Sequence, residues 1–183
     1  MNNFFIDNDI DEIITRTQDI LGQFANKHIV LTGGRGFLGR YLTEIFFRYN
    51  EVLNKPIKLT VIDNFAVSSE LGSIWPNYNN FKFIKSDASK KMDLGKDVDF
   101  IVHAAGIASP FYYRSKPLET LDVAVNGLRN ILNSASENNA KVIFFSSSST
   151  SSVVSLCPSN RDVCSKANSG LARKLTRQNG IKH

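Results

Sequence analysis

The chain has 183 residues, enough for one domain with a substantial core and too few for two of ordinary size. Its composition, 42% hydrophobic and 21% charged, is that of an ordinary soluble globular protein. The net charge of +5 arises entirely after residue 145, where the chain has six basic residues and one acidic residue. It therefore does not indicate nucleic-acid binding by residues 1–145.

Short apolar strands alternate with amphipathic helices along the first 145 residues. Apolar side chains at helical spacing predict a helix over 9–25, ahead of the main domain. Helices are also expected from the glycine-rich loop to about residue 50 and from Pro117 onward. The predicted strands, each short and continuously apolar, cover 28–31, 59–62, 81–84, 98–102 and 142–145. Such strands are buried on both faces, so the pattern predicts an α/β fold with a doubly wound parallel sheet, Rossmann-like.

The helix that begins at Pro117 carries apolar residues at steps of three and four. The repeat spans fewer than three heptads, which favours a face packed on the sheet over a coiled coil. We expect that face to consist of Leu118, Leu121, Val125, Leu128, Leu132 and Ala135.

The strongest motif is the loop Thr32-Gly33-Gly34-Arg35-Gly36-Phe37-Leu38-Gly39, which follows a predicted strand and opens a predicted helix. Glycine permits the tight turn and lets the backbone approach a pyrophosphate, and the helix N-terminus offers free N–H groups. A glycine triplet alone is weak evidence, since many such matches are plain turns. Here an acid, Asp63, ends the next strand 24 residues beyond Gly39, which favours a dinucleotide site.

Asp63 stands where a carboxylate accepts the adenosine ribose hydroxyls, which favours NAD over NADP. Two readings remain open for Arg35: a partner for a 2′-phosphate, or a solvated loop charge. Asp87 lies near the expected adenine edge, although a turn or helix-cap role is nearly as well supported. His103 ends a strand without metal-ligand spacing to other residues, which favours a core-edge histidine over a ligand.

Five segments together resemble a known family: 32–39, Asp63-Asn64-Phe65, Asp87-Ala88, 103–106 and the serines 146–148. They look like the extended short-chain dehydrogenase/reductases, and more narrowly like the NAD-dependent nucleotide-sugar epimerases and dehydratases. The stretch 108–120 has the pattern Ala-Ser-Pro-x-x-Tyr-x-x-x-Pro-x-x-Thr. It is similar to UDP-glucuronate decarboxylases, with dTDP-glucose 4,6-dehydratases next. The resemblance covers about residues 27–148.

The resemblance implies NAD as a bound cofactor and a nucleotide sugar as substrate, oxidised at C4 and processed through a 4-keto intermediate. It implies a catalytic role for Ser148, substrate contacts from Ser109 and Tyr113, no metal, and a homodimer in some relatives. The cofactor-binding residues it implies are Gly33, Gly36, Phe37, Leu38, Gly39, Asp63, Asn64, Asp87, Ala88, Ala104, Ala105 and Gly106.

The chain departs from the family after Ser148. Tyr113 is its last tyrosine, so the family's catalytic Tyr-x-x-x-Lys is absent, and Ala124 and Asn126 do not reproduce the family's asparagine three residues before Gly127. The family's C-terminal sugar-binding region has no counterpart here. Residues 146–183 hold ten serines, both cysteines and no aromatic residue.

We therefore expect three regions: an N-terminal helical extension (1–26), an NAD-binding Rossmann domain (27–148), and a Ser-rich, basic, disordered tail (149–183). Three functional interpretations stay open. The chain is the NAD-binding portion of a nucleotide-sugar decarboxylase, dehydratase or epimerase, inactive by itself; or a non-catalytic NAD-binding or interaction module; or a non-functional product of a frame break after residue 148.

The sequence predicts a cytoplasmic location. Its N-terminus lacks the basic segment of a secretory signal, and no apolar run approaches the roughly 18 residues that cross a bilayer. Two cysteines make no disulfide framework. Neither a membrane nor a nucleic acid is expected as a partner.

Overall fold

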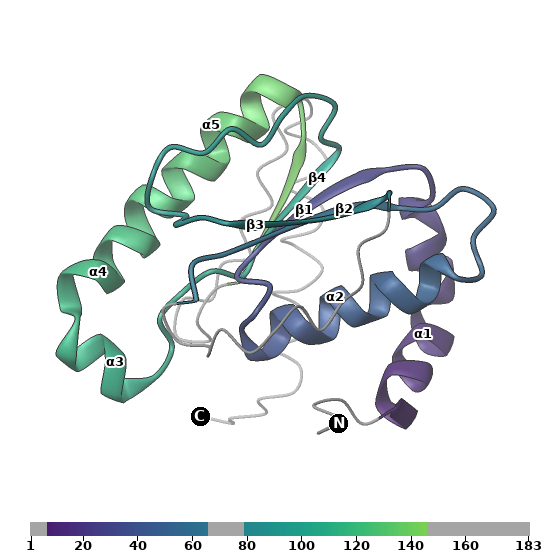
Figure 1. Cartoon of the computed structure of the whole chain (residues 1–183), viewed down its shortest axis with the longest axis horizontal. Helices are drawn as coiled ribbons and strands as arrows, with labels where there is room; N and C mark the ends of the chain where they lie inside the picture. Colours follow the sequence, from purple (N-terminus) through teal and green to yellow (C-terminus); the bar gives the residue numbers. More distant parts are fainter. Residues whose placement is uncertain (1–6, 66–78, 146–183) are drawn as a thin grey trace, which may run out of the picture.

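The structure is a computed structural model that describes residues 7–65 and 79–145. Its centre is a sheet of five parallel strands in the order β3-β2-β1-β4-β5 (Figure 1). The strand bounds are His28–Thr32 (β1), Lys58–Asp63 (β2), Phe81–Lys85 (β3), Phe100–His103 (β4) and Lys141–Phe144 (β5). This arrangement confirms the doubly wound, Rossmann-like fold class, and its strand order reverses between β1 and β4.

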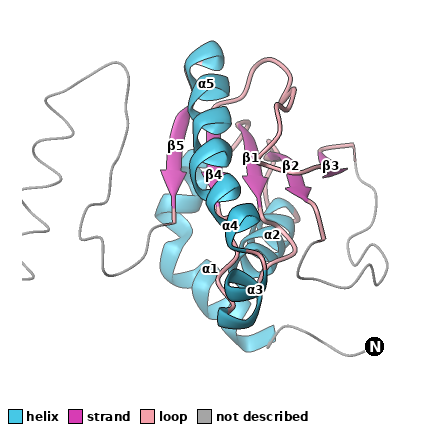
Figure 2. Cartoon of the chain, turned by 90° about the vertical axis from the view of Figure 1, so that its left-hand side faces the viewer, coloured by secondary structure: helices cyan, strands magenta, loops and turns pink. Residues whose placement is uncertain are grey.

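Helices cover both faces of the sheet. α1 (Asp7–Leu21), a 3₁₀ turn (Gly22–Phe24) and α2 (Phe37–Asn50) lie on one face. On the other face a π-helical turn (Val123–Gly127) and α5 (Leu128–Asn138) pack on the sheet. They follow α3 (Pro110–Ser115) and α4 (Pro117–Asp122), two short helices without buried residues. In Figure 2, which is turned by 90° from Figure 1, α5 lies in front of the sheet and α1 and α2 lie behind it.

Alternate residues of each central strand point to opposite layers, as the pleat requires. Ile29 and Leu31 of β1 pack toward α1 and α2, with Ile45 and Phe46 of α2 in the same cluster. Val30 packs on the other side in a cluster with residues of α5 and β5. Every residue of β1 is buried, which explains why its middle residues, Ile29-Val30-Leu31, are continuously apolar rather than alternating.

The predicted face of the helix after Pro117 is wrong in its first half. Leu118 is 72% exposed and Leu121 59%, and Val125 is exposed as well. The residues that face the sheet recur at steps of four: Val123, Gly127, Ile131 and Ala135. A three-and-four periodicity assumes a regular α-helix. The π-helical turn contains one more residue than an α-helical turn, and it therefore changes which side of the helix faces the sheet. Only Ala135 of the predicted set is fully buried, while Leu128 and Leu132 are half-buried.

Other boundaries differ by small amounts. The fourth strand begins at Phe100, two residues later than expected. Ile20 of α1 is exposed, although the helix itself forms as predicted. α3 was not anticipated as a helix.

Asp99 joins the starts of β1 and β4. Its Oδ2 accepts a hydrogen bond from the backbone N–H of His28 at 2.9 Å, and its Oδ1 pairs with Lys27 Nζ at 2.9 Å. Burial of Asp99 acts to raise its pKa, but the His28 amide and Lys27 outweigh this and hold the pKa below its usual value. The contacts of Asp99 with His28 and Lys27 fix the register of β1 against β4 at the end of the sheet opposite the glycine loop.

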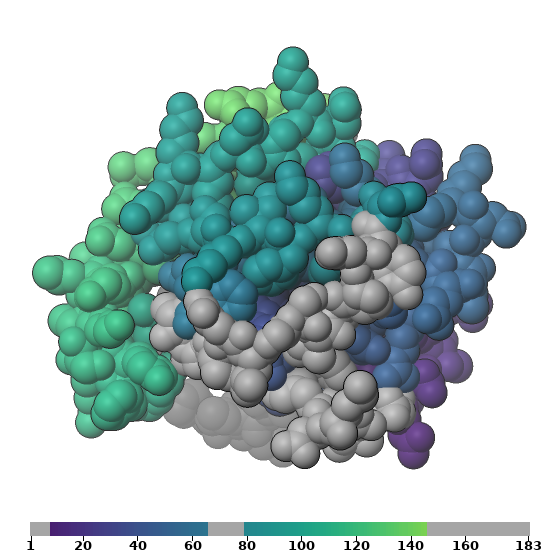
Figure 3. All heavy atoms as spheres, viewed as in Figure 1, coloured from purple at the N-terminus to yellow at the C-terminus, as the bar shows by residue number. Residues whose placement is uncertain are grey.

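The segment from β3 to β4, teal in the space-filling view, spreads over the upper front between the green helices α3–α5 and the blue and purple N-terminal elements (Figure 3). Within residues 7–65 and 79–145, no helix combines the length and apolar character needed to cross a bilayer.

Candidate functional site

A cavity of about 430 Å³ opens at the carboxyl ends of the strands, around the point where the strand order reverses. Ligand sites of open α/β sheets lie at this position, and the volume falls in the range of roughly 300–1,000 Å³ for small-molecule pockets. Its lining comprises Gly33, Arg35, Gly36, Phe37, Arg40, Ile62, Asp63, Asn64, Ser86, Asp87, Ala88, Ala104, Ala105, Gly106, Ile107 and Val123.

The glycine loop has no room for side chains at three positions. Gly33 has a φ of +75°, and a Cβ there would lie 2.6 Å from the Ala104 carbonyl and the Ala105 nitrogen. A Cβ on Gly34 would collide with the Val61 side chain, and one on Gly39 with the Gly33 carbonyl oxygen. These contacts bring the loop against β2, the β4 terminus and the first turn of α2, so that the backbone forms one wall of the cavity.

The first turn of α2 faces the cavity with its backbone. Gly36 is the N-cap and, being glycine, has no side chain that could cap the helix. The Arg40 N–H donates a hydrogen bond to the Gly36 carbonyl oxygen at 3.0 Å. The N–H groups of residues 37–39 precede this first helical bond and belong to the end of a helix that favours anions.

Asp63 is fixed by the backbone of two loops. Its Oδ2 accepts a hydrogen bond from Arg35 N–H and its Oδ1 one from Phe65 N–H, both at 2.8 Å. Each carboxylate oxygen retains further acceptor capacity, and Asp63 lines the cavity. The carboxylate is therefore held in one orientation at the end of β2.

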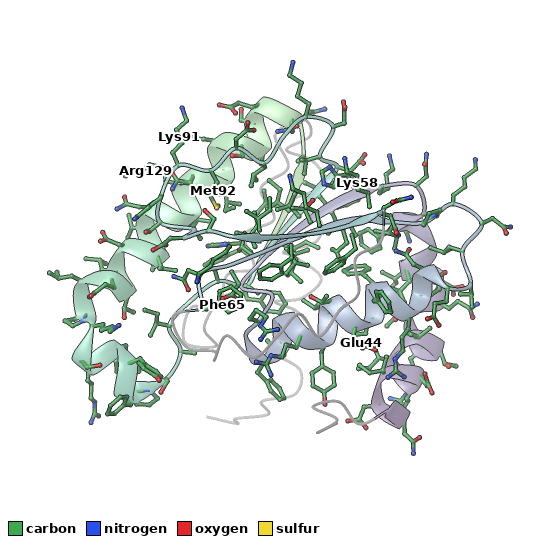
Figure 4. The ribbon with its side chains drawn as sticks, viewed as in Figure 1. Glu44, Lys58, Phe65, Lys91, Met92 and Arg129 are labelled. Atoms are coloured by element: carbon green, nitrogen blue, oxygen red, sulfur yellow. The ribbon has the colours of Figure 1, made fainter. Side chains whose placement is uncertain are left out.

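Arg35 is not a solvated loop charge, which corrects one of the two readings of this residue. It is 4% exposed, with its guanidinium carbon 5.4 Å from the centre of the Phe65 ring. Burial and the positive charge of Arg40 lower the pKa of Arg35 from its usual value, and Asp63 acts in the opposite direction. Lys85 Nζ lies 5.2 Å from the same ring, so two cations contact Phe65, the aromatic side chain labelled in Figure 4.

Asp87 and Ala88 form the wall that faces α5. Asp87 Oδ1 accepts hydrogen bonds from Ser89 N–H at 2.9 Å and from Ser89 Oγ at 2.8 Å. These bonds correspond to the turn role that the sequence leaves open for Asp87. The Ala88 carbonyl accepts a hydrogen bond from Asn130 Nδ2 at 3.1 Å. Asp87 lines the cavity as well, so the turn and the expected site are compatible.

His103 is a core-edge residue, as the sequence favours. It is 1% exposed, its ring stacks on Phe144 with centroids 5.7 Å apart, and its Nδ1 lies 2.6 Å from Thr32 Oγ1. Burial lowers the pKa of His103 to about 4, so the ring is neutral at physiological pH. Within residues 7–65 and 79–145 there is no cluster of three potential metal ligands.

The structure brings together most of the predicted cofactor-binding residues. Ten line the cavity; Leu38 is half-exposed outside its lining, and Gly39 supports the loop from behind. Ser109 is the N-cap of α3 and Tyr113 lies within this helix; neither is among the lining residues. Ser148 lies outside the described residues. Sequence reasoning did not select Arg40, Ile62, Ser86, Ile107 and Val123, which the fold adds to the cavity.

The residues present fit a dinucleotide. A backbone cradle that a Cβ would fill, a helix N-terminus and an oriented carboxylate are the features that hold a pyrophosphate and an adenosine ribose. All three meet at one cavity.

A sequence profile of the NAD dependent epimerase/dehydratase family matches residues 29–165. UDP-glucuronic acid decarboxylase 1 of Danio rerio is 30% identical over 143 residues, which cover 78% of this chain and 32% of that protein. An epimerase structure from Methanothermobacter thermautotrophicus has a TM-score of 0.60 at 20% identity, with 82% of this chain and 44% of that chain covered. The Bordetella bronchiseptica enzyme WbmF in complex with NAD+ has a TM-score of 0.55 at 17% identity, covering 80% and 43%.

The two structural likenesses concern the fold. The chain spans about a third of the length of the curated relatives it matches. The family match ends at residue 165, so it includes residues 149–165 of the predicted tail, which lie outside the described part of the chain.

Proposed function

The chain belongs to the NAD-dependent epimerase/dehydratase family, which confirms the family and the cofactor expected from the motifs, and from this premise we propose that it binds NAD in the cavity at the carboxyl ends of β1, β2 and β4. One observation carries the proposal: the glycine cradle and the oriented Asp63 carboxylate line the same cavity.

Each wall of the cavity has a distinct task in this proposal. The backbone of Gly33 and Gly36 and the α2 N-terminus hold the pyrophosphate, and Asp63 accepts the hydroxyls of the adenosine ribose. Asn64, Asp87 and Ala88 border the adenine. Ala104, Ala105 and Gly106, which follow β4, border the remainder of the cofactor. When bound, NAD supplies a hydride acceptor for oxidation of a substrate alcohol.

The proposed substrate is a nucleotide sugar, as in the UDP-glucuronic acid decarboxylases that the chain is similar to, with reaction through a 4-keto sugar. Ser148 is the proposed catalytic hydroxyl, and Ser109 and Tyr113 the proposed substrate contacts. We further propose the three-part organisation, with a helical extension at 1–26, the NAD-binding domain at 27–148 and a separate region at 149–183.

Calorimetric titration of the chain with NAD and with NADP tests the cofactor assignment. We expect tighter binding of NAD, because Asp63 repels a 2′-phosphate, and we expect Asp63→Ser to reduce the difference between the two affinities. Tighter binding of NADP by the unaltered chain would contradict the proposal and would assign the buried Arg35 to the 2′-phosphate.

A second candidate is a non-catalytic NAD-binding module. The observation that favours it is the absence of any tyrosine after Tyr113, since the family's base is a tyrosine downstream of the serine. Incubation of the chain with NAD and UDP-glucuronate distinguishes the two. Release of UDP-xylose above the level of a Ser148→Ala variant supports an enzyme, and NAD binding without product supports the module.

A further inference from the structure

The turn that follows β2 holds a bulky side chain in a backbone conformation that such residues rarely adopt. Phe65 has a φ of +60°, in the left-handed region that favours glycine. This conformation costs free energy and persists only where the surrounding structure imposes it. The Phe65 N–H donates a hydrogen bond to Oδ1 of Asp63, so the strained turn belongs to the carboxylate that is proposed to bind the adenosine ribose.

The Phe65 ring is held by side chains from two separate segments. Phe83 and Lys85 of β3 are two residues apart and point to the same side of that strand. The Phe83 ring centre lies 5.5 Å from that of Phe65, and Lys85 Nζ lies 5.2 Å from it. From the glycine loop, the buried Arg35 guanidinium lies 5.4 Å from the same ring centre. Both cations are therefore within the roughly 6 Å over which an aromatic ring attracts a cation, and Figure 4 shows Phe65 near the N-terminal end of α2.

The two residues that bind the Asp63 carboxylate also contact each other. The Arg35 N–H donates to Oδ2 of Asp63 and the Phe65 N–H to Oδ1, both at 2.8 Å. The side chains of these two donors meet in the cation–π contact. Movement of either donor would weaken both its hydrogen bond to Asp63 and the contact with the other donor. The ring therefore restrains the two amides that set the orientation of the carboxylate.

We propose that Phe65 is a positioning residue for the cofactor: its ring, packed against the Arg35 guanidinium, fixes the orientation in which Asp63 accepts the adenosine ribose hydroxyls. The proposal rests on the proposed function, since it takes NAD to occupy the cavity. Phe65 is not among the residues that line the cavity, so it acts through Asp63 and not by contact with NAD. A carboxylate that is already oriented need not be ordered when the ligand binds, and this favours affinity.

The test is a double-mutant cycle on the dissociation constant of NAD, measured by calorimetry. It compares the unaltered chain with Phe65→Leu, with Asp63→Ser and with both changes together. We expect Phe65→Leu, which keeps apolar bulk but has no ring, to weaken NAD binding about fivefold, the scale of one cation–π contact. In the Asp63→Ser background the same change should alter the affinity by less than about twofold, because the carboxylate through which the ring acts is gone.

Two further variants at this position separate the ring from the turn. Phe65→Tyr keeps the ring and should bind NAD within about twofold of the unaltered chain. Phe65→Gly removes the ring but adopts a positive φ without strain, so it should fold and bind NAD about as weakly as Phe65→Leu. Phe111→Leu makes the matched change at an exposed residue of α3 and should leave NAD affinity unchanged.

Circular dichroism shows whether each variant is folded, and Phe65→Gly takes the place of Phe65→Leu in the cycle should the latter not fold. Equal losses in the two backgrounds would overturn the proposal, because the ring would then act on the fold and not through Asp63. Unchanged affinity in Phe65→Leu or Phe65→Gly would overturn it as well, and so would a loss in Phe65→Tyr as large as that in Phe65→Leu. Absence of NAD binding by the unaltered chain would overturn the proposed function itself, which is a different result from any of these.

Discussion

Acid should destabilise this fold through His103. The ring is 1% exposed, and burial lowers its pKa to about 4 from an ordinary value of 6.5. In the unfolded chain the ring takes up a proton near pH 6.5, whereas in the folded chain it does so only near pH 4. The contribution of His103 to stability is therefore complete above pH 6.5 and is lost progressively as the pH falls through the interval down to about 4.

The magnitude follows from the two pKa values. Between pH 7.5 and pH 5 the proton uptake of the unfolded chain costs about 2 kcal/mol of unfolding free energy, and the full difference approaches roughly 3 kcal/mol below pH 4. A domain of this size has roughly 5–15 kcal/mol in total, so the effect is measurable by urea unfolding followed by circular dichroism.

His103→Asn is the matched variant. Its amide can keep a hydrogen bond to Thr32 Oγ1, but it neither titrates nor stacks on Phe144. The variant should be less stable than the unaltered chain at pH 7.5 and should lose about 2 kcal/mol less on going to pH 5. His28, whose pKa is also lowered, chiefly by burial, is present in both proteins and cancels in the comparison. Equal losses in the two proteins would refute the reasoning.

Two further predictions concern the ends of the sheet. Gly39→Ala should abolish detectable NAD binding in calorimetry and lower the melting temperature by several degrees, because the added Cβ would meet the Gly33 carbonyl oxygen. Gly106→Ala is the control: its Cβ would meet nothing within 4 Å, so the melting temperature should stay unchanged. At the other end of the sheet, Lys27→Met should lower the unfolding free energy in urea by at most about 1 kcal/mol, since the Lys27–Asp99 ion pair is partly exposed. Asp99→Ala should lower it by more, because this variant also leaves the His28 N–H without its acceptor. Equal costs for these two variants would show that the ion pair, not the backbone bond, joins the strands.

Local chemistry in the sequence was enough to predict the class of fold and most of the candidate site. Continuous apolar strands indicate a sheet buried on both faces, and parallel strands bring their carboxyl ends to one edge. Gly33 and Gly36 follow one such strand and Asp63 ends the next, at the spacing that a dinucleotide requires. These residues were found because their roles depend on backbone geometry that neighbouring residues impose.

The tertiary structure decided which other side chains share the cavity and which helix face is buried. Arg40 reaches the cavity because its side chain turns back to the Arg35 carbonyl, a contact that no periodicity encodes. Arg35 is buried, and its guanidinium lies over the ring of Phe65, thirty residues away in the sequence. The π-helical turn directs Val123 and Gly127 toward the sheet in place of Leu121 and Val125. A sequence pattern specifies periodicity and local conformation, whereas contacts between distant segments depend on how the packed elements meet.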